Sequence, residues 1–187
     1  MPNTERHIRS ANTNDIPAII AIMEQHFIHQ KAAMDKDTLE SVGFLIHGFS
    51  ESDIREAIAD EKNHIVLVAT ENDAVIGYVL NYDLKKLNDW MVDLQSTSEY
   101  LAILTGKKVF YHRHIAKIPH KKGVGKKLLQ SLMNEAVLRN YDYIVCQILQ
   151  KPYQNRASVK LHEALGFFQI GVVEEEEYTF GVYLKAM

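Results

Sequence analysis

The chain has 187 residues, of which 47% are hydrophobic, and a formal net charge of -3. This size predicts one compact domain spanning residues 1–187, and the charge argues against a nucleic-acid-binding surface over the whole protein. The single cysteine, Cys146, excludes an internal disulfide, and no apolar run approaches the roughly 20 residues of a membrane span. The polar stretch from Met1 to Ser10 has no signal-peptide core, so we expect a cytoplasmic protein with no membrane or nucleic-acid partner.

Hydrophobic periodicity predicts two helices and a β-hairpin in the first half of the chain. Apolar residues recur at helical spacing from Ile16 to Phe27, and Pro17 stands in the first turn, where proline is tolerated. Ser50 and Asp53 have the spacing of a capping box at the start of the second helix. In chain order we expect a strand at 6–9, a helix from 16, a helix from 51, and a hairpin of strands 65–69 and 75–80.

The segment 81–108 differs from its surroundings, because Trp90, Tyr100 and several aliphatic residues are spaced among polar ones. It is too apolar for a linker, so we expect an inserted helix and loop. Beyond it we expect a strand at 109–118, a helix from 124, a strand at 143–148, a helix at 155–165, and strands at 169–173 and 178–184.

The strand, turn, helix and strand from 109 to 148 form a βαβ crossover, so the two strands should lie parallel within a mixed sheet. The turn then lies at the carboxyl end of a strand, where open α/β sheets favour ligands. Gly123 and Gly125 in this turn have no Cβ, so backbone N–H groups at the helix start are able to approach a phosphate.

Four interpretations of this turn compete with one another. A P-loop would need glycine in place of His120 and serine or threonine in place of Lys127, and a dinucleotide fingerprint would need glycine in place of Leu128. An ordinary tight turn that caps a helix is the third. A fourth pattern fits the residues better: a polar residue, then any two residues, then two glycines separated by one residue.

This pattern, from His120 to Gly125, resembles motif A of the GNAT N-acetyltransferase superfamily, Gln/Arg-x-x-Gly-x-Gly/Ala. Downstream, the segment from Asn155 to Phe167 resembles motif B, Asn-x-x-Ala/Ser-x-x-Leu-Tyr-x-x-x-Gly-Phe. The resemblance covers nearly the whole chain, and it explains segment 81–108 least. It implies an α/β (α+β) fold of the GNAT type, with a mixed, mostly antiparallel central sheet of about seven strands flanked by about four helices.

The resemblance implies an enzyme that transfers an acetyl group from acetyl-CoA, without a metal, to a primary amine of a small molecule or peptide by direct attack in a ternary complex. In the family the turn binds the pyrophosphate of coenzyme A and the preceding strand pairs with the pantetheine arm. In family members, the residue equivalent to Asn155 holds this arm. Asparagine is also a residue type that suits a plain helix N-cap. The implied cofactor-binding residues are Ile115, Ala116, Lys117, His120, Lys121, Lys122, Gly123, Val124, Gly125, Lys126 and Asn155.

The expected catalytic residues are histidines. His162 stands where many family members carry a tyrosine thought to protonate the CoA thiolate; it is able to act as a general acid, or to serve only as a structural hydrogen-bonding residue. Two-residue alternation places His112 and His114 on one strand face, where either is able to relay a proton through water. A third ligand that would make this pair a metal site is not evident.

Two neighbouring residues limit the chemistry. Gln147 stands on the strand that often carries a catalytic glutamate in the family, and glutamine cannot serve as a base. Cys146 lies in an apolar strand and is a poor nucleophile there.

Two alternatives to an enzyme stay open: a catalytically degenerate CoA or acyl-CoA sensor, and an interaction protein that docks a partner on segment 81–108. For an enzyme, we expect an acceptor site built from the first two helices, Phe44 to Phe49, and the inserted segment with Trp90 and Tyr100. A homodimer through the last strands is a further expectation.

Overall fold

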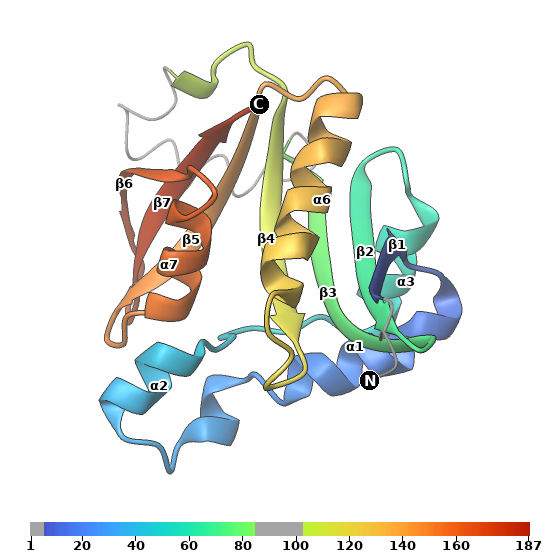
Figure 1. Ribbon diagram of the computed structural model, residues 1–187. Helices are drawn as coiled ribbons and strands as arrows, with labels where there is room; N and C mark the ends of the chain where they lie inside the picture. The colour runs from blue at the N-terminus through green and yellow to red at the C-terminus, as the bar shows by residue number, and fades with distance from the viewer. Residues whose placement is uncertain (1–5, 85–102) are drawn as a thin grey trace.

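The computed structural model describes residues 6–84 and 103–187, and its centre is a seven-stranded sheet (Figure 1). The strand order is β1-β2-β3-β4-β5-β7-β6, and every neighbouring pair is antiparallel except β4 and β5. The strands are β1 (Arg6–Ser10), β2 (His64–Glu71), β3 (Ala74–Asp83), β4 (Val109–Lys117), β5 (Tyr143–Lys151), β6 (Phe168–Glu174) and β7 (Thr179–Ala186). The mixed, mostly antiparallel sheet predicted from the sequence is confirmed.

Helices cover both faces of this sheet (Figure 1). On one face, α6 packs a stripe of leucines against β2, β3 and β4, and α7 lies beside it over β5. On the other face, α1 and α3 pack against β2 and β3. The α-helices are α1 (Ile16–Glu24), α2 (Lys36–Val42), α3 (Glu51–Ala59), α6 (Val124–Leu138) and α7 (Arg156–Glu163). In the described part of the chain, no helix is long and apolar enough to cross a membrane.

Local sequence signals explain most of these elements. The capping box predicted at Ser50 is present, because its hydroxyl accepts the Asp53 N–H while the Asp53 carboxylate accepts the Ser50 N–H. Pro17 lies in the first turn of α1, as its missing N–H favours. The hairpin between β2 and β3 turns at Asn72 and Asp73, both with positive φ, which these residue types tolerate better than most.

Two expectations about elements need correction. The helix α2 was not predicted, because seven residues between the Asp35 N-cap and Gly43 are too short to show a period. The inserted segment does not begin at Asn81, because β3 continues to Asp83 in register with β4. Trp90 and Tyr100, which were expected at the acceptor site, lie outside the described residues.

The pairing of β4 with its two neighbours shapes the centre of the molecule. On one side, the register with β3 shifts between Leu80 and Asn81, so that Arg113 is an extra residue in β4, a β-bulge. On the other side, β4 pairs in parallel with β5 only from Val109 to Tyr111, and beyond Tyr111 the two strands are no longer paired. The predicted parallel crossover is therefore confirmed, but it is short.

Candidate active site

A cavity of about 560 Å³ lies where β4 and β5 separate. Its walls come from β4, β5, the start of α6, α7 and the segment after α2. The paired end of the two strands closes it near Tyr111, and the turn before α6 borders it near Lys117. The cavity therefore joins the two sequence motifs, although they are about thirty residues apart in the chain.

The glycine turn has the geometry of an anion-binding helix start. Gly123 is the N-cap of α6 with φ +78°, and its lack of a side chain leaves the first N–H groups of the helix uncapped. Those groups and the helix dipole favour a negative charge. A Cβ on Gly125 would lie 3.5 Å from Leu161 Cδ2, at the cavity wall, so a side chain there would occupy ligand space.

A third glycine, which sequence reasoning missed, places this helix start. A Cβ on Gly77 would lie 2.9 Å from Val124 Cγ1, closer than real Cβ contacts come, and 3.0 Å from the Ala116 carbonyl oxygen, which is also tight. Glycine at 77 therefore lets α6 begin directly against β3. Its position within a strand gave no signal, because an isolated glycine in a strand has several explanations.

The expected cofactor-binding residues of the turn divide into two groups. Gly123, Gly125 and Lys126 line the cavity. Lys121 is held by an ion pair with Glu71, and the Lys122 carbonyl oxygen accepts a hydrogen bond from Arg6, so both are tied to the β1–β2 edge. Neither of these two residues lines the cavity, and the same holds for His120, which is exposed, and Val124, which is buried in the core.

The end of β4 offers backbone groups to the cavity. The Ile118 N–H donates to the Ile76 carbonyl, so by alternation Ile115 and Lys117 direct their backbone groups away from β3, toward the space beside β5. The Lys117 carbonyl already accepts a 2.7 Å hydrogen bond from His26 Nε2. Ala116, with its backbone toward β3, contributes its side chain to the core under α1 and to the cavity wall.

Asn155 uses both ends of its side chain within the protein. Its Oδ1 accepts the Ser158 N–H at 3.1 Å as the N-cap of α7, and its Nδ2 donates to the Phe44 carbonyl at 2.9 Å. It therefore joins α7 to the segment after α2 at the cavity wall.

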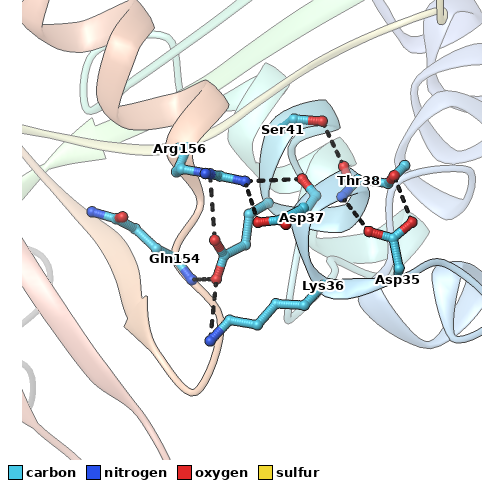
Figure 2. A network of polar contacts seen from close by, with 8 residues as sticks. Asp35, Lys36, Asp37, Thr38, Ser41, Gln154 and Arg156 are labelled. Carbon is cyan, nitrogen blue, oxygen red and sulfur yellow. Dashed lines mark hydrogen bonds and ion pairs between the residues drawn. The ribbon is translucent and has the colours of Figure 1, made fainter.

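A polar network fixes the same two elements further out (Figure 2). The buried carboxylate of Glu40 in α2 accepts the Gln154 N–H at 2.9 Å and pairs with Arg156 Nε at 3.3 Å. Arg156 also pairs with Asp37, and Lys36 lies 3.9 Å from the Glu40 carboxylate. These contacts attach α2 to the start of α7. No motif in the sequence predicted them.

His162 is almost completely buried, with 1% of its surface exposed, and it lines the cavity. Its Nδ1 lies 2.8 Å from the Ser158 carbonyl oxygen, which can only accept, so Nδ1 carries the proton. Burial lowers the pKa of this imidazole to about 4, so the ring is neutral at pH 7 and Nε2 holds a lone pair. Among the buried side-chain nitrogen and oxygen atoms of the described residues, Nε2 alone has no hydrogen-bond partner.

His112 faces His162, with the two ring centroids 5.2 Å apart. Its Nδ1 lies 2.6 Å from Asn81 Oδ1, and Asn81 Nδ2 donates to the Ile65 carbonyl at 2.9 Å. This second hydrogen bond fixes which end of the amide faces the ring, so His112 also carries its proton on Nδ1. Burial and the neighbouring histidines hold its pKa well below the usual range, so this ring is neutral too.

The expectation that His112 and His114 share a face is wrong. The bulge at Arg113 adds one residue between them and turns them to opposite faces of the sheet. His114 packs on Phe49, with ring centroids 4.7 Å apart, and lies 3.3 Å from the Tyr78 hydroxyl. Burial lowers its pKa to about 3, and its ring also borders the cavity.

The paired end of the cavity carries a chain of polar side chains. Arg113 Nη1 donates to the Tyr111 hydroxyl at 3.5 Å, and this hydroxyl donates to Gln147 Oε1 at 3.4 Å. Glu175, in the loop between β6 and β7, lines the same region. Cys146 is buried on β5, and burial raises the pKa of its thiol, so it stays protonated. Within residues 6–84 and 103–187, no group of three His, Cys, Asp or Glu side chains is arranged to hold a metal.

Comparison with known proteins agrees with this geometry. The model of the acetyltransferase (GNAT) family matches residues 32–167. Solved structures that share the fold include the ribosomal-protein-S18-alanine N-acetyltransferase from Escherichia coli, with a TM-score of 0.65 and 15% identity over 97% of this chain and 94% of that one. A search of curated protein sequences found no significant match.

Two further solved structures share the fold. A putative acetyltransferase from Salmonella typhimurium, solved with its cofactor acetyl-CoA, has a TM-score of 0.66 and 20% identity over 98% of this chain and 94% of that one. An N-acetyltransferase from Staphylococcus aureus Mu50 has a TM-score of 0.62 and 21% identity over 98% and 99%. A family match over most of the chain, two motifs that meet at one cavity and a sheet that opens between β4 and β5 together place this protein in the GNAT acetyltransferase family.

Proposed function

We propose that this protein is an N-acetyltransferase that moves the acetyl group of acetyl-CoA to a primary amine of a small molecule or peptide, by direct attack within a ternary complex. Family membership and the cavity between β4 and β5 support the reaction class. The observation that carries the enzyme interpretation is the unpaired, buried Nε2 of His162, a residue that lines this cavity.

The residues of the cavity fit coenzyme A. The uncapped start of α6 at Gly123 suits the pyrophosphate, and Lys126 adds a positive charge there. The backbone groups of Ile115 that face the cavity suit the amides of a pantetheine arm, which would occupy the space that β5 leaves beside β4. Acetyl-CoA bound in this way supplies an activated thioester.

The two buried imidazoles supply proton transfer. A neutral ring with its proton on Nδ1 accepts at Nε2, so His162 takes the proton that the acceptor amine loses as its nitrogen bonds to the acetyl carbon. The same Nε2 then delivers that proton to the sulfur released when the carbon–sulfur bond breaks. His162 thus acts as an acid only after it has acted as a base, and His112 stands beside it as a second acceptor.

Other candidate groups are less suited to this role. The Cys146 thiol stays protonated, which favours direct attack over an acyl-enzyme. Gln147 is engaged by Tyr111 and carries no titratable proton. His114 points to the opposite side of the sheet from His162, where it is available for acceptor contacts rather than for the sulfur.

The test combines turnover with binding. Thiol release from acetyl-CoA is measured with a broad panel of amines, while titration calorimetry measures CoA affinity. We expect CoA binding together with amine-dependent thiol release. CoA binding without turnover across the panel would favour a sensor, and absence of CoA binding would contradict the proposal as a whole. A pull-down that required segment 81–108 while turnover did not would support a separate docking role.

A further inference from the structure

The guanidinium of Arg113 differs from every other arginine of the chain. All six arginines lie in the described residues, and five of them form an ion pair with a carboxylate. Within these residues Arg113 forms none with an N–O distance up to 4.0 Å, although it is partly buried. Glu175 acts on this guanidinium only from beyond that distance. A partly buried cation with no carboxylate in direct contact favours an anion that comes closer.

The bulge in β4 places this guanidinium at the paired end of the cavity. Arg113 is the extra residue of the bulge, so it has no register partner in β3, and it lines the cavity wall. The Tyr111 hydroxyl accepts one of its N–H groups at 3.5 Å and in turn donates to Gln147, which orients the group. A guanidinium has five N–H donors, and this hydrogen bond uses one of them.

The chemistry of these donors selects a planar anion. Two parallel N–H groups of a guanidinium match the two oxygens of a carboxylate, and such bidentate pairs are among the strongest hydrogen bonds in proteins. The coenzyme A phosphates belong at the other end of the cavity, at Gly123 and Lys126. The anion at Arg113 is therefore supplied by the acceptor.

We propose that Arg113 binds a carboxylate of the acceptor, and that the acceptors are small amino carboxylates of the amino-acid type. This inference rests on the proposed function. His112 and Arg113 both line this cavity. One small acceptor is therefore able to present its amine to the imidazole pair and its carboxylate to the guanidinium, as an amino acid would.

The experiment compares acceptors in matched pairs, each an amino acid and its carboxamide. The carboxamide amine is less basic, so more of it is unprotonated at a given pH, and this bias acts against the expected result. We expect the wild type to favour the carboxylate by at least about tenfold in kcat/KM. Arg113→Met should remove this preference by lowering the carboxylate rate while leaving the carboxamide rate within about threefold.

Three further variants sharpen this comparison. Arg55→Met removes an exposed, surface-paired arginine and should leave the preference intact. Arg113→Lys keeps the positive charge but not the two parallel N–H donors of the guanidinium, and it should retain part of the preference for the carboxylate. Glu175→Gln tests whether Arg113 serves only to balance the Glu175 carboxylate. If this variant lost the preference for the carboxylate acceptor as fully as Arg113→Met does, the proposal would be overturned. Equal rates on both members of each pair in the wild type would overturn it as well.

A binding measurement separates this inference from the proposed function. Amino acids are titrated into the CoA-loaded protein by calorimetry, with and without Arg113→Met. Binding that Arg113→Met abolishes supports the carboxylate site even if no acceptor is acetylated, in which case only the proposed function fails. If no amino carboxylate binds while neutral amines are acetylated, the proposed function stands and the assignment of Arg113 is wrong.

Discussion

The Asn81 amide and the His112 imidazole share a 2.6 Å hydrogen bond in which Asn81 Oδ1 accepts from Nδ1. Both residues are buried, and the other end of the amide donates to the Ile65 carbonyl. The amide is therefore unable to turn over without breaking a backbone contact. Asn81 determines which nitrogen of His112 is left as an acceptor, which makes it a positioning residue rather than a catalytic one.

Asn81→Asp should move the pH profile of the enzyme. A carboxylate at this position stabilises the charged imidazole, so the pKa of His112 rises. Since a protonated ring cannot accept, the acid limb of kcat/KM should shift to higher pH if His112 takes part in the reaction. The pH dependence of kcat/KM with acetyl-CoA saturating measures this shift.

The control for this variant is Asn81→Ala, which removes the amide without adding a charge. It should lower activity at all pH values and leave the acid limb in place. An Asn81→Asp profile that coincides with that of the wild type would assign His112 a structural role.

His162→Gln tests the proton carrier. Glutamine keeps much of the volume and is able to hydrogen-bond, but it cannot carry a proton between two groups. We expect kcat to fall by about 10²- to 10⁴-fold, the usual contribution of general acid–base catalysis. CoA affinity, measured by calorimetry, should change little, because the proposed phosphate-binding turn is formed by Gly123 and its neighbours.

His29→Ala is a matched control, since this imidazole is exposed and stacks on Phe27 outside the cavity. Its kcat should stay at the wild-type value. If His162→Gln also retained full kcat, proton transfer would have to be assigned to His112 or to solvent.

Gly125→Ala should separate folding from ligand binding. The new methyl group meets Leu161 at an ordinary contact distance, and alanine is favoured over glycine in a helix by up to about 1 kcal/mol. The unliganded protein should therefore keep or gain thermal stability, while the methyl group at the cavity wall weakens CoA binding by at least about tenfold. Thermal melts with and without CoA measure both effects.

Gly123→Ala gives the opposite pattern in the unliganded protein. No atom lies within 4 Å of the new Cβ, but φ is +78°, a conformation that costs alanine about 1 kcal/mol or more. This variant should melt at a lower temperature without CoA. A loss of stability in Gly125→Ala of the same size would argue against the tolerance inferred from the Leu161 contact.

Glu40→Ala should loosen the attachment of α2 to α7 (Figure 2). The change leaves the Gln154 N–H without its acceptor and Arg156 without its less exposed carboxylate. Hydrogen bonds to charged groups contribute about 1.5–3 kcal/mol, and we expect a loss in that range in the free energy of unfolding measured with urea. Asp37→Asn is the comparison, because Asp37 is 89% exposed and such pairs contribute about 1 kcal/mol or less.

If both substitutions had the same small effect, the network would be a surface feature without a positioning role. A rise in KM for the acceptor in Glu40→Ala, with CoA affinity retained, would instead show that α2 helps to shape the acceptor side.

Much of the fold was accessible from the sequence, because its elements carry local signals. The period of α6, the capping box at Ser50 and the hairpin turn at Asn72 are each encoded within a few neighbouring residues. The turn at the proposed cofactor end of the site was accessible for the same reason, since Gly123 and Gly125 indicate a tight turn before a helix.

The chemical end of the site was less accessible, because it depends on register. A β-bulge has no single-sequence signature, so alternation placed His112 and His114 together, whereas Arg113 separates them. Asn81 lies 31 positions from His112, and only the pairing of β3 with β4 brings the two side chains into contact. Arg113 was recognisable as a candidate only once the carboxylate partners of all the other arginines were known.

The bulge in β4 also separates two kinds of constraint within one short segment. The Asn81 side chain hydrogen-bonds His112 at one end and the Ile65 carbonyl at the other, so a change at 81 or 112 disturbs a buried network that joins β2, β3 and β4. The extra residue at 113 belongs to no cross-strand pair, and its side chain is open to exchange without cost to the ladder. Under the proposed roles, a change at 112 would disturb the hydrogen-bonded proton acceptor, whereas a change at 113 would alter the choice of acceptor and leave the strand pairing intact.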